Sequence, residues 1–165
     1  MKPQLIAIDG PVAVGKSSVG SRLARRLGYV FFDTGMIYRA FTWKVLKSGI
    51  SIEDEQKICQ LANTTKFNFV PLQGCYLSPF IDDEDVSSKL LRPEVEAQVS
   101  LISKIPEVRQ TLIQEQRRLA QRGKLVMPFL CPQISPYTLG ISLLSLWPPS
   151  CIYYYQADHD PSSRT

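Results

Sequence analysis

A glycine-rich segment near the amino terminus has the residue types that hold phosphate groups. Residues 10–17 read GPVAVGKS and match the pattern G-x-x-x-x-G-K-[ST]. Glycines in such a loop let the backbone curl until successive N–H groups point at phosphate oxygens. Lys16 can bridge β- and γ-phosphates, and the Ser17 hydroxyl can ligate Mg²⁺. The segment therefore predicts a site for a nucleoside triphosphate, formed by Gly10, Pro11, Val12, Ala13, Val14, Gly15, Lys16, Ser17 and Ser18.

A second group of polar residues follows the next apolar segment of the chain. Asp33, Thr34 and Gly35 come directly after the run YVFF, and Arg39 lies about one helical turn further on. The carboxyl ends of parallel strands meet at one edge of a sheet, so this group should lie near the glycine-rich loop. A helix N-terminus with a guanidinium fork forms an anion site. Two facing phosphate sites are the arrangement expected of a kinase with a phosphorylated acceptor.

The segments around these residues have the periodicity of an α/β domain. The apolar run Leu5–Ile8 predicts a buried strand, and residues 29–32 predict a second one. Between them, residues 16–27 have helical spacing, with Val19, Leu23 and Leu27 on one face. Strand, glycine-rich turn, helix and strand in this order favour a parallel sheet with flanking helices.

The following residues predict further helices and strands up to residue 127. Helices are expected over 37–46, over 53–62 with a capping box that begins at Ser51, and over 93–104. Residues 66–70 and 75–81 predict a hairpin, in which Pro79 favours an edge position. A strand is expected at 124–127. Another helix should begin at Pro106, with a repeating set of residues on one face: Val108, Leu112, Ile113, Gln116 and Leu119.

Composition and charge narrow the class of protein. The chain has 165 residues, 44% of them hydrophobic, and a net charge of +4, which fits one soluble domain and excludes collagen, coiled coil and wholesale disorder. Scattered cysteines with a single histidine make a zinc site improbable, and the start of the chain carries no export signal, so we expect a cytoplasmic protein. The basic excess is too mild to predict nucleic-acid binding. The run Leu139–Trp147 is well short of the ~20 residues of a membrane span.

Charge and proline content change sharply near residue 127. Residues 128–165 contain half of the prolines and only three charged residues, Asp158, Asp160 and Arg164. We therefore interpret residues 1–127 as the folded core and residues 128–165 as a proline-rich, low-charge tail of poor order. Within this tail, Cys151–Tyr155 has the composition of a strand that would take the fourth position in the sheet.

Several separate motifs in residues 4–127 resemble those of bacterial cytidylate kinases, in the same order. Besides the two polar groups above, they are Asp83–Val86, Leu91–Val95, Ser100, Ile105–Arg109 and Gln116–Arg118. The resemblance implies the fold of a P-loop nucleoside monophosphate kinase, with a substrate-binding insert at about residues 60–110. It also implies transfer of a phosphoryl group from ATP to CMP or dCMP, a place in pyrimidine metabolism, and a cytoplasmic monomer with no nucleic-acid or membrane partner.

The resemblance also gives roles to individual residues. Lys16 and Arg39 would be catalytic, and Ser17 would hold Mg²⁺. Ser100 and Arg109 fall where the family reads the cytosine ring, and a hydroxyl and a guanidinium can discriminate its O2/N3 edge by hydrogen bonds. The implied site for the acceptor nucleotide consists of Asp33, Thr34, Arg39, Ser100 and Arg109.

The resemblance stops after Met127, where nothing matches the family's G-R-D-I-G-T turn, its remaining core strands or its arginine-rich lid. These parts of the fold would be missing or replaced. Because an arginine at the transferred phosphoryl group contributes ~10³–10⁵ in rate, we expect the kinase activity to be impaired. The alternative is a catalytically inactive, truncated or frameshifted nucleotide-binding remnant. An RNA-associated P-loop protein would need a denser basic face than the arginines of residues 22–26 and 117–122 supply. The preference among CMP, dCMP and UMP stays open.

Overall fold

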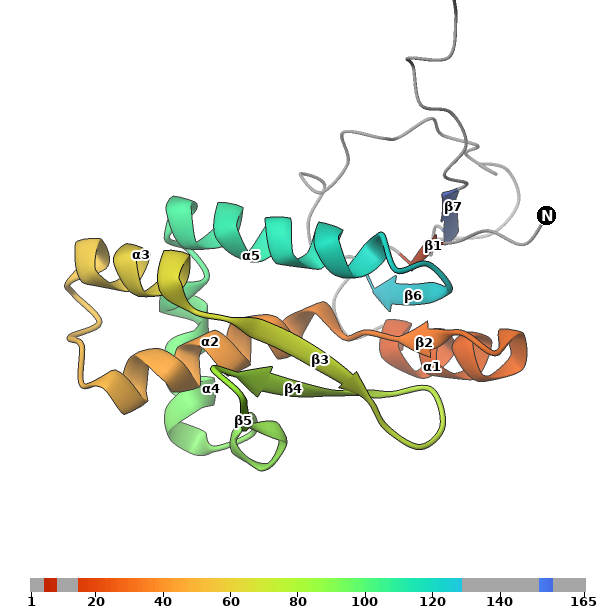
Figure 1. The fold of residues 1–165 in the computed structure, drawn as a ribbon, viewed down its shortest axis with the longest axis horizontal. Helices are drawn as coiled ribbons and strands as arrows, with labels where there is room; N and C mark the ends of the chain where they lie inside the picture. The colour runs from red at the N-terminus through yellow and green to blue at the C-terminus, as the bar shows by residue number, and fades with distance from the viewer. Residues whose placement is uncertain (1–4, 9–14, 129–151, 156–165) are drawn as a thin grey trace, which may run out of the picture.

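The computed structural model describes residues 5–8, 15–128 and 152–155, which form two β-sheets with helices packed around them (Figure 1). In chain order the elements are β1 (Leu5–Ile8), α1 (Lys16–Leu27), β2 (Val30–Phe31), α2 (Thr34–Ser48), α3 (Glu55–Thr64), β3 (Phe67–Pro71), β4 (Leu77–Ile81), β5 (Glu84–Asp85), the 3-10 helix η1 (Ser87–Lys89), α4 (Pro93–Ile102), α5 (Pro106–Ala120), β6 (Leu125–Pro128) and β7 (Ile152–Tyr155).

The main sheet has the strand order β2-β6-β1-β7. β1 and β2 both pair in parallel with β6, so the predicted parallel opening of the fold is confirmed. β7 pairs with β1 in the antiparallel direction, which places it fourth in the sheet, as predicted for this segment. Apart from Pro128 and β7, the tail whose poor order we predicted lies outside the described residues.

Helix α1 has the predicted bounds but a different buried face. Gly20 and Ala24 are buried against the sheet, Leu23 and Leu27 are partly buried, and Val19 is half exposed. The apolar face that we predicted is therefore only partly covered by the sheet, and Val19 lies at its exposed margin. The helix approaches β2 so closely that only a residue without a side chain fits at the centre of the contact, which shifts the buried face by one residue.

Helix α2 begins at Thr34, three residues before the predicted start at Ile37. Asp33 is the N-cap, and its Oδ1 accepts a hydrogen bond from the Gly35 N–H at 2.9 Å. This side chain satisfies a backbone donor that the first helical turn leaves without a partner, so the helix extends back to the end of β2. We missed this start because the apolar periodicity of the segment begins only at Ile37.

The second sheet has the order β3-β4-β5, which corrects the predicted position of one strand. β4 lies in the centre although it contains Pro79, which we had assigned to an edge strand. The carbonyl of Pro79 accepts from the Val86 N–H on the β5 side, where the short β5 has already ended. Since N and O of one residue point to the same side of an antiparallel strand, no ladder donor is lost there.

The cap of α3 also differs from the prediction. Asp54 rather than Ser51 caps this helix, and the Asp54 carboxylate accepts a hydrogen bond from the Lys57 backbone N–H.

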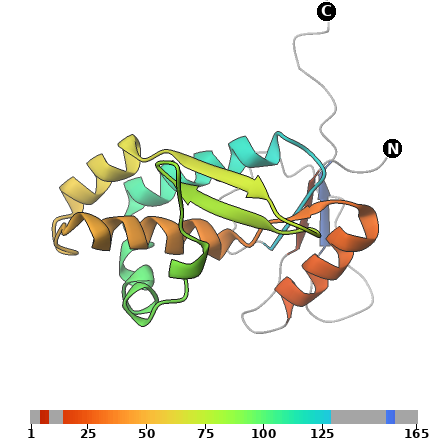
Figure 2. The same cartoon turned by 60° about the horizontal axis from the view of Figure 1, so that its bottom comes forward.

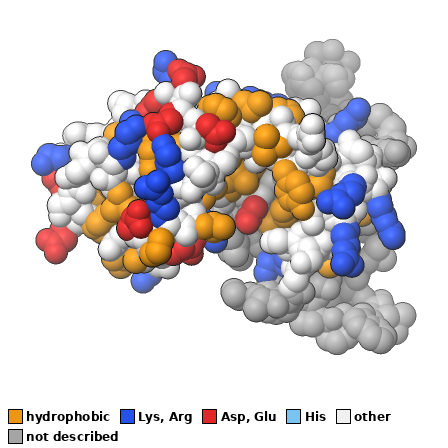
Figure 3. Space-filling model, turned by 90° about the horizontal axis from the view of Figure 1, so that it is seen from below, with side chains coloured by type: hydrophobic (Ala, Val, Ile, Leu, Met, Phe, Trp, Pro, Cys, Tyr) orange, Lys and Arg blue, Asp and Glu red, His pale blue; other side chains and the backbone are white. Residues whose placement is uncertain are grey.

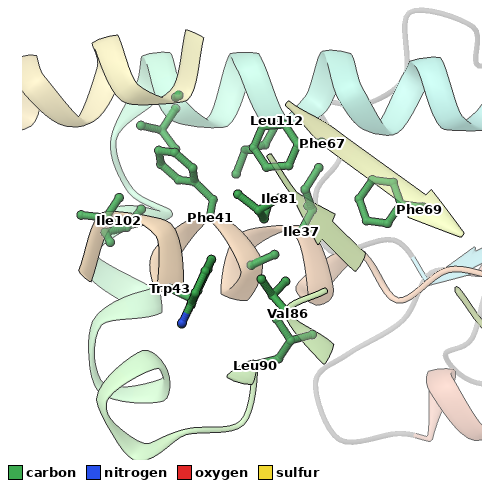
Figure 4. Packing of buried hydrophobic residues seen from close by; sticks show 14 of the residues in the cluster. Ile37, Phe41, Trp43, Phe67, Phe69, Ile81, Val86, Leu90, Ile102 and Leu112 are labelled. Carbon is green, nitrogen blue, oxygen red and sulfur yellow. The ribbon is translucent and has the colours of Figure 1, made fainter. Parts of the chain in front are cut away.

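The largest apolar cluster lies between α2, α5 and the hairpin β3–β4 (Figure 4). Figure 4 shows Ile37 and Phe41 of α2, Phe67 of β3 and Leu112 of α5 grouped together, while Phe69 lies further along β3. The set of α5 residues that we predicted to share one face is buried throughout: Val108, Leu112, Ile113, Gln116 and Leu119. The predicted helices at residues 93–104 and from 106 onward, and the strand at 124–127, are likewise confirmed within a few residues.

The tip of the β3–β4 hairpin reaches across to the main sheet, and Figures 1 and 2 both show this hairpin extending toward β2 and α1. The Phe31 N–H donates to the Cys75 carbonyl at 2.5 Å, and the Cys75 thiol, itself buried, donates to the Ser21 carbonyl at 3.5 Å. The rings of Phe31 and Tyr76 meet edge to face with their centroids 6.2 Å apart. These contacts join the second sheet to the β2 edge of the main sheet.

We expect Gly20→Ala to destabilise the protein, although alanine favours a helix over glycine by about 1 kcal/mol. A Cβ at this position would lie 2.6 Å from Cε2 of Phe31 and 3.3 Å from Cδ1 of Ile8. The Phe31 ring is buried against Tyr76 and cannot move away freely, so overpacking of about 1–3 kcal/mol should outweigh the gain in propensity. Urea unfolding measures the difference. Arg22→Ala, an exposed change on the same helix, is the control and should shift the free energy of unfolding by less than about 0.5 kcal/mol. Equal stability of Gly20→Ala and the wild type would contradict the packing argument.

Candidate functional site

The first turn of α1 carries the described part of the glycine-rich loop. Gly15 is the N-cap in a left-handed conformation, with φ 83° and ψ 20°, and Lys16 begins the helix. Ser17 and Ser18 follow on the exposed surface. A helix start concentrates partial positive charge and backbone N–H groups, which favours an anion at this position. The other predicted loop residues, Gly10, Pro11, Val12, Ala13 and Val14, lie outside the described residues.

The start of α2 is held against the end of β6. The Thr34 hydroxyl is buried and donates a 3.0 Å hydrogen bond to the carbonyl of Pro128. Its proton is therefore engaged by the backbone, and only the oxygen lone pairs are left to a ligand. Thr34 thus has a clear structural role in this conformation, and its predicted contact with an acceptor nucleotide stays a prediction.

Arg39 lies about one turn into α2 and folds back toward the helix start. Its Nε donates to Oε1 of Glu96 on α4 at 2.5 Å. Its Nη1 lies only 2.7 Å from the point where a Cβ on Gly35 would be, so a side chain at residue 35 would collide with the guanidinium. Gly35 has an ordinary helical backbone, and it is this close approach that requires glycine. The guanidinium therefore lies against the N-terminus of α2, with the carboxylates of Glu96 and Asp33 beside it.

Ser100 lies on α4, and the side chain of Arg109 lies beside the C-terminal end of the same helix. Ser100 is exposed and lies one turn after Glu96, so both are on the same face of α4. Arg109, at the start of α5, reaches back with Nη1 toward the Ser103 carbonyl at 3.5 Å, near the C-terminal end of α4. The structure thus arranges three of the predicted acceptor residues, Arg39, Ser100 and Arg109, along α4.

The two helix starts lie at the same edge of the main sheet, as predicted. α1 follows β1 and α2 follows β2, and the two strands run in the same direction on either side of β6. Two strand spacings separate their carboxyl ends by about 10 Å. This separation suits two phosphate groups of different nucleotides, one at each helix start.

Glu96 is a residue of the site region that sequence reasoning missed. Glu96 had no signal of its own in one sequence, apart from its place one turn before Ser100. Gln116 was predicted to be buried, and it is, but neither its Nε2 nor its Oε1 finds a hydrogen-bond partner among the described residues. It lies on the Arg109 face of α5, two turns further along.

Other charged groups serve the packing of the described elements. The Glu84 carboxylate accepts from Lys47 and Lys89, which lowers its pKa, and both ammonium groups lie over the Trp43 ring at 4.9 and 4.6 Å from its centroid. Figure 3 shows basic and acidic side chains interleaved at the end of the molecule opposite α1, and basic side chains gathered at the α1 end. The guanidinium groups of Arg118 on α5 and of Arg122, which follows the end of α5, donate to carbonyls of β3, which leaves fewer basic groups for a polyanion.

The fold and the arrangement of the site define an α/β protein with the fold of a P-loop nucleoside monophosphate kinase. The sequence model of the cytidylate kinase family matches residues 6–128, and the chain belongs to this family. The recognised resemblance over the first part of the chain is therefore confirmed.

Curated relatives agree with this family over the same part of the chain. The chain is 44% identical over 122 residues to the cytidylate kinase of Caldanaerobacter subterraneus subsp. tengcongensis, covering 74% of this chain and 52% of the relative. It is also 44% identical over 127 residues to that of Caldicellulosiruptor bescii, covering 77% and 56%. A bifunctional pantoate ligase/cytidylate kinase of Nostoc sp. (strain PCC 7120) is 45% identical over 125 residues, covering 74% and 23%. The chain spans about half the length of the cytidylate kinases it matches. None of the helices that the structure describes combines the length and apolar character needed to cross a membrane.

Replacement of Gln116 by methionine should raise stability. The amide is buried without a partner among the described residues, and such a group costs about 1–3 kcal/mol. Methionine has a similar length and no strong hydrogen-bonding group, so the free energy of unfolding should increase by an amount of this order. Gln114→Met, at an exposed position of the same helix, is the matched control and should have little effect. Destabilisation by Gln116→Met would show that the amide has a partner in solution.

Proposed function

We propose that the protein transfers a phosphoryl group from ATP to CMP or dCMP, giving CDP or dCDP, as a cytoplasmic monomer. The observation that carries the proposal is the position of Arg39, folded over the start of α2 at the sheet edge where α1 also begins. Ser100 and Arg109 lie along α4 beside it. The curated relatives are named as cytidylate kinases, which supports this function over a catalytically inactive remnant.

The donor nucleotide belongs at the start of α1. Lys16 would contact the phosphates of ATP, where the helix N-terminus adds positive charge. Ser17 is exposed in the same turn and offers the hard oxygen ligand that Mg²⁺ prefers, so the residues present fit this cation. When bound, Mg²⁺ neutralises charge on the phosphates.

The acceptor nucleotide belongs between the start of α2 and α4. The guanidinium of Arg39 would bind the CMP phosphate through its remaining donors, with Asp33 and Thr34 shaping the helix start. The hydroxyl of Ser100 and the guanidinium of Arg109 would hydrogen-bond the O2/N3 edge of cytosine. The Arg39 contact would bring the acceptor to the donor phosphates, and orientation of this kind supplies much of the catalysis in phosphoryl transfer.

The first prediction is ADP release that depends on CMP. Purified chain with ATP, Mg²⁺ and CMP should release ADP in a coupled assay, and Lys16→Ala should abolish the signal because it removes the cation at the donor phosphates. dCMP and UMP in place of CMP define the acceptor preference.

A folded chain that releases no ADP with either cytidine monophosphate would contradict the proposed function. Impaired turnover remains a separate prediction, and a rate within the ordinary ~1–100 s⁻¹ of kinases would overturn it.

Gly35→Ala should weaken CMP binding without weakening the fold. The added Cβ would meet Nη1 of Arg39 and move the guanidinium, so we expect KM for CMP to rise at least about tenfold, equivalent to ~1.4 kcal/mol, with KM for ATP unchanged. Stability should hold or increase by up to ~1 kcal/mol, since alanine favours a helix.

The double variant Gly35→Ala/Arg39→Ala is the control for this mechanism. It should bind CMP no worse than Arg39→Ala alone, because the glycine acts through the arginine. Additive losses in the double variant would contradict it.

A further inference from the structure

The ion pair between Arg39 and Glu96 joins the two helices that border the candidate acceptor site. Arg39 lies on α2 and Glu96 on α4, and the Nε to Oε1 distance is 2.5 Å. The two side chains are 28% and 44% exposed, so both are within reach of a ligand from solvent. Glu96 is therefore a direct neighbour of the group that the proposed function places on the acceptor phosphate.

The geometry of the pair leaves part of the guanidinium for a second anion. An arginine offers Nε on its side and Nη1 with Nη2 at its end, as donors fixed in one plane. Glu96 accepts from Nε. Nη1 lies over Gly35 in the first turn of α2, where the helix start attracts negative charge. The carboxylate thus holds the arginine by its side while its end faces the helix N-terminus.

We infer that Glu96 is a positioning residue, which orients Arg39 so that its terminal nitrogens face the phosphate of the acceptor nucleotide. This inference rests on the proposed function and adds a residue to its site. A long side chain that is already ordered loses less rotamer freedom on binding, which favours affinity. The negative charge of Glu96 opposes a phosphate, but the high dielectric constant near an exposed position weakens this repulsion, and the cationic guanidinium attracts both groups. The ordering effect should therefore dominate.

The test compares Glu96→Ala and Glu96→Gln in binding of CMP and of cytidine, which lacks the phosphate. Glu96→Ala should raise Kd for CMP about three- to tenfold, the contribution of one pre-ordered side chain, and leave Kd for cytidine unchanged. Glu96→Gln keeps an oxygen acceptor for Nε and should recover most of the loss. Glu94→Ala, at an exposed glutamate two residues earlier in the first turn of α4, is the matched control and should leave Kd for CMP unaltered.

Other outcomes would overturn the inference. Unchanged CMP binding by Glu96→Ala would show that the ion pair does not position Arg39 for the phosphate, and tighter binding would show that the carboxylate competes with the phosphate. Equal losses for CMP and cytidine would show that the variant disturbs the site as a whole.

Nuclear magnetic resonance of the Arg39 Nε–H group in the protein without ligand separates this inference from the proposed function. Its signal should be ordered in the wild type and Glu96→Gln and averaged by motion in Glu96→Ala. The same averaging in the wild type would overturn the positioning role. If the wild type binds neither CMP nor dCMP, the proposed function fails, and the part of the inference that concerns the phosphate fails with it. The resonance still decides whether Glu96 orders Arg39.

Discussion

The candidate site depends on a single buried hydrogen bond, from the Thr34 hydroxyl to the carbonyl of Pro128. It connects the beginning of α2 to the end of β6, two segments far apart in the chain. Because a buried donor without a partner is costly, the helix start is held in this position, and everything that α2 carries is placed with it. On one side of the helix this is the apolar core around Ile37 and Phe41, and on another side it is Arg39. The same hydrogen bond therefore helps to position both the core-packing face of α2 and Arg39.

Two features near this hydrogen bond favour the site over local helix stability. Glycine in the first turn of a helix is a weaker helix former than alanine, yet residue 35 admits the guanidinium of Arg39 against the backbone. An exposed ion pair contributes little to folding on its own, so the value of the Arg39–Glu96 pair lies in orientation more than in stability. A group that is ordered before its ligand arrives binds with less loss of entropy.

The sequence was sufficient where periodicity and end signals agreed. The buried face of α5 followed from its 3–4 spacing, and the parallel opening of the main sheet followed from strand, turn and helix in order. The misses have local physical causes. A side-chain cap at Asp33 lengthened α2 beyond its apolar pattern, and the close approach of Phe31 moved the buried face of α1 to Gly20. The partner of Arg39 could not be predicted, because a contact between residues 57 positions apart leaves no trace in one sequence.

The contact between the β3–β4 hairpin and β2 sets a limit on how the protein can change shape. The second sheet packs against α2 in the apolar core, and the backbone of Cys75 and the ring of Tyr76 also attach it to β2. A body held at two separated points can turn only about the line that joins them. Closure over bound nucleotides must therefore either pivot about this line or break the contact of the hairpin tip. In the second case the buried thiol of Cys75 becomes accessible, and its rate of alkylation would report each opening.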